Sequence, residues 1–418
     1  MRSVDDRGGM SHGEDRIPPR REAGDRALRG EPLALELGVS RPPIAPADLI
    51  ERTADAAMFC DEAEARFAAG DLRGAALAWE SALQRDADRA EAWLGLSRVR
   101  SKLGELDAAE RCARRAIDLD PARSEAWFLL AASEQARDDD ASAIASLRRA
   151  LEVDPELAEA WNNLGNAYCR TGQVGRAIRC YEKAAELREG AFECWFNLGN
   201  AHGLLLQMEA ACDAYERAAE RSRANPHIWY NLAYARACCG RLEDAAEGYR
   251  RAAELSPDDY EAWYNLGHTY ADLGLHGESV AAYRKALEVQ DDHEAWNNMG
   301  NVLLRLGQRA DAIHAYRKAL ELRADYDPSW NNLGNALEEA GDLEGAAEAY
   351  ALAVERMPLR PTYLLNHASV LARMGRTEQA VDVLAAALGV APAIRGLLCG
   401  FPEFSPLLRH PKLRRAPG

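Results

Sequence analysis

Tryptophan recurs along this chain at a fixed interval, and that interval constrains the fold more than any other feature. Successive tryptophans are 34 residues apart, with one spacing of 33, at Trp93, Trp127, Trp161, Trp195, Trp229, Trp263, Trp296 and Trp330. One further period in each direction reaches Phe59 and Leu364. Such a period indicates ten small stacked units, rather than the two or three globular domains that a length of 418 residues would suggest.

Residues at fixed distances from the tryptophan position predict two helices in each unit. A leucine or methionine stands three residues on and a small residue four on, as in Leu164 and Gly165, so these side chains share one helical face with Trp161. A glycine eleven residues on, present in eight units, is expected to end the first helix. In the second helix an alanine, present in all ten units, lets two backbones approach closely.

Two units lack the turn glycine and carry Asp138 or Leu206 in its place. Aspartate tolerates the left-handed backbone conformation, whereas leucine does not. We therefore expect the turn at Leu206 to be reshaped.

The pattern predicts an all-α chain of ten stacked units with a continuous core. The units are expected at residues 56–89, 90–123, 124–157, 158–191, 192–225, 226–259, 260–292, 293–326, 327–360 and 361–394. Residues 1–55 are rich in Arg, Pro, Gly and acids and are expected to be a disordered tail, starting at Met1 or at Met10. Residues 395–418 mix basic and apolar side chains, which suits a cap on the last unit or, alternatively, a partner-binding peptide.

Together these residues resemble a known repeat. The pattern W-x-x-L-G-x-x-Y, followed by Ala, Tyr, Ala and Pro, is similar to the tetratricopeptide repeat (TPR) and recurs in register. The resemblance implies a right-handed α-solenoid, or superhelix, in which the first helix of each unit lines the concave surface.

Asparagine forms columns on the face of the first helix opposite the tryptophan stripe. The positions two and five residues after tryptophan share this face. The first position holds Asn163, Asn197, Asn231, Asn265, Asn298, Asn332 and Asn366, and the second holds Asn166, Asn200, Asn301 and Asn335. In the middle of the chain Tyr234 and His268 replace asparagine in the second column, and Tyr230 and Tyr264 stand one residue after tryptophan. These four aromatic residues are expected to select side chains of the peptide.

These columns predict a peptide-binding groove. Asparagine is a poorer helix former than alanine, but its amide offers a donor and an acceptor that can pair with the backbone of an extended peptide. The columns resemble the asparagine ladder in the TPR region of the O-linked N-acetylglucosamine transferases, which hold substrate peptides by their backbone. The alternative is that each asparagine only bonds a neighbouring helix, or spread when repeats were duplicated.

Other classes of function find little support in the sequence. A net charge of −16 disfavours nucleic acids and anionic membranes. Motifs for nucleotides, metals or a catalytic nucleophile are missing, so we expect neither an enzyme nor a cofactor or metal. Nine scattered cysteines, without a C-x-x-C pair or a long apolar segment, indicate a cytoplasmic protein. The Lys and Arg clamp with which some TPR domains bind chaperone tails is also missing.

We therefore expect a scaffold that binds a partner protein or an extended peptide in the concave groove. Two alternatives remain open: a targeting or regulatory subunit for a separate enzyme, such as a glycosyltransferase, and a structural protein that assembles with itself.

Overall fold

Antiparallel helix pairs form the whole array. The computed structural model describes residues 46–188 and 190–414, and these form helices without a strand, which confirms the all-α superhelix. The first helices of the ten pairs are α1 Pro46–Ala68, α3 Ala90–Lys102, α5 Ser124–Gln135, α7 Ala158–Arg170, α9 Phe192–Leu204, α11 Pro226–Cys238, α13 Tyr260–Asp272, α15 His293–Arg305, α17 Asp327–Glu339 and α19 Pro361–Arg373. The second helices are α2 Leu72–Arg85, α4 Leu106–Leu119, α6 Asp140–Val153, α8 Val174–Leu187, α10 Met208–Arg221, α12 Leu242–Leu255, α14 His276–Val289, α16 Arg309–Leu322, α18 Leu343–Arg356 and α20 Thr377–Val390.

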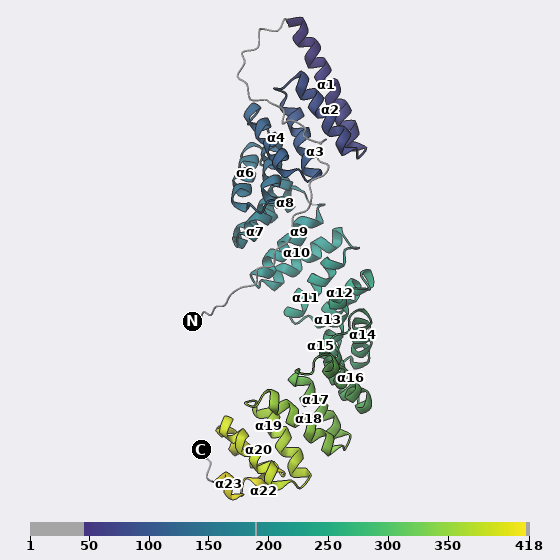
Figure 1. Ribbon diagram of the computed structural model, residues 1–418, viewed down its shortest axis with the longest axis vertical. Coiled ribbons are helices and arrows are strands. Elements are labelled where there is room, and N and C mark those ends of the chain that lie inside the picture. Colours follow the sequence, from purple (N-terminus) through teal and green to yellow (C-terminus); the bar gives the residue numbers. More distant parts are fainter. Residues whose placement is uncertain (1–45, 189, 415–418) are drawn as a thin grey trace, which may run out of the picture.

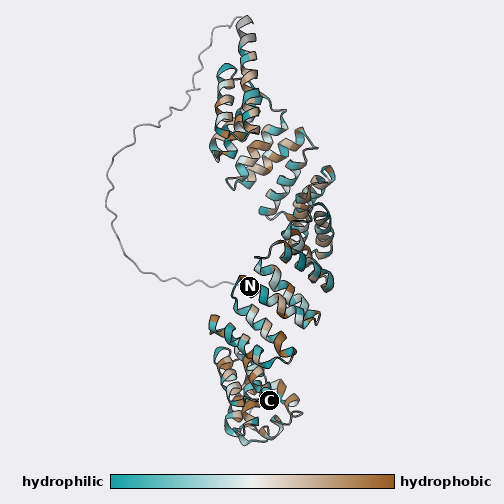
Figure 2. Ribbon diagram, turned by 90° about the vertical axis from the view of Figure 1, so that its right-hand side faces the viewer, coloured by the Kyte–Doolittle hydropathy of each residue, from teal (hydrophilic) through white to brown (hydrophobic). Residues whose placement is uncertain are grey.

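The array is elongated, with α1 and α2 at one end and α19 to α23 at the other (Figure 1). Hydrophobic and hydrophilic residues are interspersed along its helices instead of gathering in one region (Figure 2). Among the described residues, no single helix is long and apolar enough to cross a membrane, although α20 together with Pro392–Leu398 reaches that apolar length as a pair bent by 117°.

The first helix begins further upstream than the sequence predicts. Helix α1 begins at Pro46, before the expected start of the first unit at residue 56, so residues 46–55 are helical and not disordered. No glycine or proline interrupts residues 47–69, which explains why the helix extends upstream of the repeat. The prediction for residues 1–45 lies outside the described part of the chain.

The turns within the units share one backbone geometry. Eight turn glycines have φ between 75° and 87°, and Asp138 has φ 59°. Our expectation that Leu206 reshapes its turn was wrong. Leu206 has φ 57°, and the turn keeps its two hydrogen bonds, from Leu206 N to Gly203 O (2.9 Å) and from Gln207 N to His202 O (3.0 Å). Packing of α9 against α10 therefore outweighs the cost of a left-handed leucine, about 1–2 kcal/mol.

Glycine and tyrosine set the spacing within a unit. A methyl group added at Gly334 would lie 2.5 Å from Cε1 of Tyr350, a ring that is almost fully buried. The pairs Gly165–Tyr181, Gly199–Tyr215 and Gly300–Tyr316 have the same arrangement. The small residue is required because the tyrosine ring of the second helix lies directly against the first helix.

In most units a tryptophan connects the first helix to the loop before it. The indole Nε1 of Trp161 donates to Pro155 O (2.8 Å), and that of Trp330 donates to Ala324 O (2.9 Å). Arginines of the second helix cover several of these rings, as Arg251 does with its guanidinium 4.5 Å from the centre of Trp229. The regular spacing of tryptophan therefore reflects a regular contact between units.

The first helices lie on the inner side of the curve. They contact one another across units, as α3 contacts α5 and α15 contacts α17, whereas within α1–α20 no pair of second helices is in comparable contact. In a curved stack the elements on the inner side lie closest together. The faces of the first helices that point away from the second helices consequently form the concave surface.

Residues after the last pair cover its exposed end. They form the 3-10 helix η1 Pro392–Ile394 and the short helices α21 Arg395–Leu398, α22 Phe404–Leu407 and α23 Pro411–Arg414, with α22 and α23 against α20. The side chains of Leu398, Phe404, Leu407 and Leu413 are buried there. Lys412 lies 2.9 Å from Asp382, and thus an ion pair also connects the segment to α20.

Candidate functional site

The asparagine columns lie on the concave surface, on the first helices from α7 to α19. All eleven of the asparagines in the predicted columns are half-buried, so their amides are accessible from one side. Each column has its own hydrogen-bonding pattern, and the pattern determines which amide atoms remain available.

Asparagines five residues after tryptophan accept hydrogen bonds through their carbonyl oxygens. Tyrosines of the second helix donate, with distances from hydroxyl oxygen to Oδ1 of 2.8 Å for Tyr181 and Asn166, and 2.7 Å for Tyr215 and Asn200. The same bond joins Tyr316 to Asn301 (2.8 Å) and Tyr350 to Asn335 (2.7 Å). We call these four asparagines the inner column. Their carbonyl oxygens are held inside the unit by the second helix.

Asparagines two residues after tryptophan donate to the preceding unit. Nδ2 of Asn332 lies 3.1 Å from Oδ1 of Asn297 and 3.0 Å from Oδ1 of Asn301. Asn197 bonds Asn162 (3.0 Å) and Asn166 (3.4 Å) in the same way. The remaining bonds run from Asn231 to Asn200 (3.4 Å), from Asn366 to Asn331 (2.9 Å), from Asn265 to the Tyr230 hydroxyl (3.0 Å) and from Asn298 to the Tyr264 hydroxyl (2.9 Å).

We call these six asparagines, together with Asn163, the bridging column. At Asn163, the first of the column, the backbone oxygen accepts from Gln135 Nε2 (3.1 Å). The bridging asparagines thus do bond neighbouring helices, as the alternative interpretation of the sequence anticipated. In five of these amides the bonds use only Nδ2, whereas Asn298 is bonded at both ends, because its Oδ1 also accepts from Asn297 Nδ2 (3.3 Å).

The two columns are left with complementary groups. Among the described residues, no hydrogen bond uses Nδ2 of the inner asparagines, or Oδ1 of Asn197, Asn231, Asn265, Asn332 and Asn366. The amide atoms that carry no hydrogen bond therefore differ between the two columns, a division that the sequence did not indicate. The inner column offers donors and the bridging column acceptors, about 4.5 Å apart along the helix axis, which is three residues of helical rise.

The aromatic residues between the columns fall into two groups. Tyr230 and Tyr264 pack edge-on against tyrosines of their second helices, with ring centres 5.5 and 5.8 Å apart. Burial, reinforced by the nearby Glu294 carboxylate, raises the pKa of Tyr264 to about 12, so its hydroxyl stays neutral. Tyr234 and His268 are exposed, and His268 lies 3.3 Å from Asp272. Of the four aromatic residues, only these two have exposed side chains on the concave surface.

A cavity of about 430 Å³ opens beside the columns, between α9, α10 and α11. Asn200, Asn231 and Tyr234 line it, together with Leu204, Leu206 and Met208, which our sequence analysis did not identify as site residues. The signal was present, because Leu204 to Leu206 form a turn of three leucines where other units include a charged residue or glycine. Without the structure nothing placed that turn beside the asparagines.

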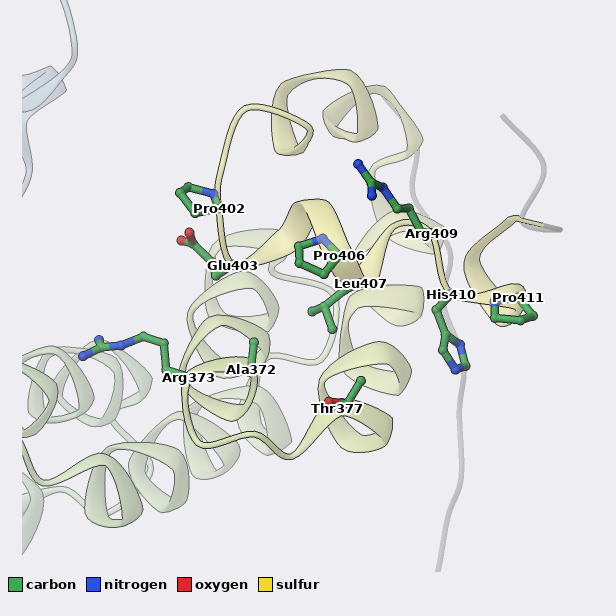
Figure 3. A pocket seen from close by; sticks show the side chains of 10 residues that line it. All are labelled: Ala372, Arg373, Thr377, Pro402, Glu403, Pro406, Leu407, Arg409, His410 and Pro411. Carbon is green, nitrogen blue, oxygen red and sulfur yellow. The ribbon is translucent and has the colours of Figure 1, made fainter.

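A larger cavity lies elsewhere. It measures about 700 Å³ and separates the turn between α19 and α20 from the C-terminal segment. The guanidinium groups of Arg373 and Arg409 point away from it, and Pro402, Pro406 and Leu407 form much of its wall (Figure 3). The cavity is a gap between the array and the segment that covers its end, without a converging set of polar groups.

Comparisons with known proteins agree with the helix pairs. Models described as tetratricopeptide repeat match residues 66–133, 158–191, 192–225, 258–325 and 297–362, and a model described as TPR repeat matches residues 136–172 and 239–274. A search of curated proteins gives no match.

Solved structures resemble parts of the array. The C-terminal part of a TPR repeat-containing protein from Cytophaga hutchinsonii superposes with a TM-score of 0.50 at 15% identity, over 57% of this chain and 98% of its own. The protein MamA is 27% identical over 38% of this chain and 94% of its own, with a TM-score of 0.38. YrrB, titled a TPR protein with an unusual peptide-binding site, is 24% identical over 44% of this chain and 95% of its own, with a TM-score of 0.41.

Proposed function

Because this chain belongs to the tetratricopeptide-repeat proteins, we propose that it is an interaction scaffold, not an enzyme, and that it binds an extended segment of a partner protein along the concave surface. The TPR fold itself supports a role in protein interaction. The use of the groove, and the recognition of the partner through its backbone, are the finer parts of the proposal.

The division of donors and acceptors between the two columns is the observation that carries the proposal. An extended peptide presents an N–H and a C=O at each residue, and both need partners when they leave water. Asn301 offers its Nδ2 group and Asn332 its Oδ1 atom, and these atoms belong to adjacent units. Repetition along the array offers such pairs at regular intervals, whatever the partner's side chains are.

Negative charge at the edge of the groove limits which partner segments can bind there. Glu193, Glu261 and Glu294 stand at the start of first helices, where a carboxylate also stabilises the helix N-terminus. All three side chains are exposed. They lie along one edge of the groove and repel an acidic tail, so the partner segment is expected to be neutral or basic.

A substitution that keeps the fold but removes donors tests the groove. In Asn166→Asp with Asn301→Asp, each carboxylate still accepts from Tyr181 or Tyr316, but the Nδ2 donor is lost. Each lost hydrogen bond costs about 0.5–1.5 kcal/mol, so the pair should weaken binding about ten-fold. The probe is the tightest decapeptide selected from a random display library on the wild-type protein, and its affinity is measured by fluorescence anisotropy.

The matched control is Asn225→Asp. Asn225 lies outside the columns and accepts from His227 N (3.0 Å), a bond that aspartate retains. The control adds charge to the protein without changing the groove and should leave affinity within two-fold. Equal affinity of the double variant and the wild type would show that peptides bind elsewhere.

A modified peptide tests recognition through the backbone. Methylating the backbone nitrogens of the probe peptide removes the donors that the bridging column would accept. Scanning single N-methyl groups along the peptide should weaken binding about two- to ten-fold at several positions spaced to match the units. If only side-chain substitutions in the peptide affect binding, backbone recognition is wrong and the scaffold reads side chains.

A further inference from the structure

The fifth unit has an apolar turn on the concave side. Its residues Leu204, Leu205 and Leu206 occupy positions that elsewhere include a charged residue or glycine, such as Arg170, Asp272 and Gly240. Leu204 is 65% exposed and Leu206 is 79% exposed. Tyr234 on the next first helix is also exposed, so three large apolar side chains meet solvent together.

Folding does not account for Leu206. Its backbone has φ 57°, a conformation that disfavours leucine, and its exposed side chain adds nothing to the core. Glycine occupies this position in eight units with the same turn geometry. Costly backbone conformations of this kind cluster at functional sites. The leucine therefore requires an explanation outside the stability of the array.

The cavity beside this turn has an uncharged wall. Its volume of about 430 Å³ exceeds that of a single ordered water, about 30 Å³, many times over. Leu204, Leu206, Met208 and Ala211 supply apolar surface, and the Tyr215 hydroxyl is already bonded to Asn200. In a chain with a net charge of −16, a wall without any charged side chain is complementary to an uncharged group.

The same wall includes one asparagine from each column. The Asn200 Oδ1 atom accepts from Tyr215 and from Asn231, which leaves Asn200 Nδ2 and Asn231 Oδ1 without a bond among the described residues. A donor and an acceptor for a peptide backbone thus border an apolar cavity. This arrangement suits one peptide residue, whose backbone would pair with the amides while its side chain enters the cavity.

We infer that this cavity is a specificity pocket that takes one large apolar side chain, such as Leu, Met or Phe, from the segment bound in the groove. The inference rests on the proposed function and adds to it the place in the groove where a side chain of the bound peptide is recognised. The occupant is a side chain of a partner peptide. Burying such a side chain favours binding by about ten- to a hundred-fold over a small polar one.

Selection from a random decapeptide library on the full-length protein tests the pocket. Peptides selected on the wild type should share one position rich in Leu, Met or Phe. Replacing that residue by Ser should weaken binding at least ten-fold. Leu206→Gly and, separately, Leu204→Ser should weaken binding of the peptide selected on the wild type by a similar factor. Both variants should also lose the preference for Leu, Met or Phe at that position. Leu77→Ser, at a leucine that is 64% exposed on α2, is the matched control and should change nothing.

The possible outcomes distinguish a failure of the pocket inference from a failure of the groove proposal. Selected peptides without an apolar position, or unchanged affinity in both leucine variants, would overturn the pocket and leave the groove intact. Failure to select any peptide would overturn both. If instead the wild type forms dimers by sedimentation and Leu204→Ser abolishes them, the occupant is a second copy of the chain and the inference is wrong.

Discussion

A left-handed leucine in a solvent-exposed turn predicts an unusual substitution effect. Leu206→Gly removes the steric cost of φ 57° but increases the flexibility of the unfolded chain, so the net gain should be about 0.5–1 kcal/mol. Gly240→Leu, in the next unit at φ 76°, should lose about 1–2 kcal/mol. Urea unfolding followed by circular dichroism measures both. A destabilised Leu206→Gly protein would show that the leucine contributes contacts that its exposure conceals.

Close contact between glycine and tyrosine gives a second test on single residues. Gly334→Ala places a methyl group 2.5 Å from the buried ring of Tyr350 and should cost about 1–3 kcal/mol. Gly175→Ala, on the exposed start of α8 with no atom within 4 Å of the new methyl group, should gain up to about 1 kcal/mol. Thermal unfolding of the two variants compares them directly, and equal melting temperatures would contradict the role of Gly334 in spacing the helices.

Residue offsets predicted which side chains line the groove, but not which atoms they present. The period places Asn332 on the concave face because helix geometry repeats reliably. Whether its Nδ2 or its Oδ1 faces the groove depends on the distance to Asn297, 3.1 Å, which the stacking of two units sets. Hydrogen bonds between units are consequently the part of the site that one unit's sequence does not determine.

At the scale of the helix, the buried alanines between helices predict how destabilisation by a larger side chain spreads to neighbouring units. Ala252 on α12 is fully buried beside Ala253, Ala262 and Trp263. Ala252→Leu should overpack this contact and cost about 1–3 kcal/mol. Since units stabilise their neighbours, hydrogen exchange should accelerate in α11 to α14 and not in α12 alone. Unchanged protection in α11, α13 and α14 would mean that the unit absorbs the strain by itself.

A histidine replaces leucine at one core position of the last pair, and it makes stability depend on pH. Burial lowers the pKa of His367 below its ordinary value of about 6.5. Below that pH the unfolded chain binds a proton that the folded chain resists, so His367 destabilises the fold progressively as pH falls from 6.5 toward its folded pKa. His367→Leu should therefore reduce the loss of melting temperature between pH 8 and pH 5, and parallel losses in both proteins would contradict this.

The positions of the helices could be predicted from the sequence within the repeats but not outside them. Alanine, glycine and tryptophan at constant offsets define a unit because each makes the same kind of contact in most units. The start of α1 at Pro46 and the three short helices after Ile394 lie outside the period. These segments cover the two ends of the stack. The contacts they make there occur once and do not follow the repeat, so the period does not predict them.

At the scale of the whole molecule, stability should be distributed along the array. Each pair packs mainly on its neighbours in sequence, so there is no single core that forms all at once. Deleting residues 395–418 exposes the apolar face of α20 that Leu398, Phe404 and Leu407 cover. We expect the truncated protein to lose hydrogen-exchange protection in α19 and α20 first, with α1 to α10 unaffected. Uniform loss along the chain would indicate a single cooperative unit.

The hydrogen bonds between first helices also give the array different mechanical properties on its inner and outer surfaces. Amides such as those of Asn332 and Asn366 join neighbouring units along the inner surface, while the second helices have no comparable contact along the outer one. Pulling the two ends apart straightens the curve and loads these side-chain bonds in tension before any helix unwinds. In the binding mode that we propose, a peptide would lie parallel to the same bonds across several units, so we expect the occupied array to resist extension more strongly than the empty one.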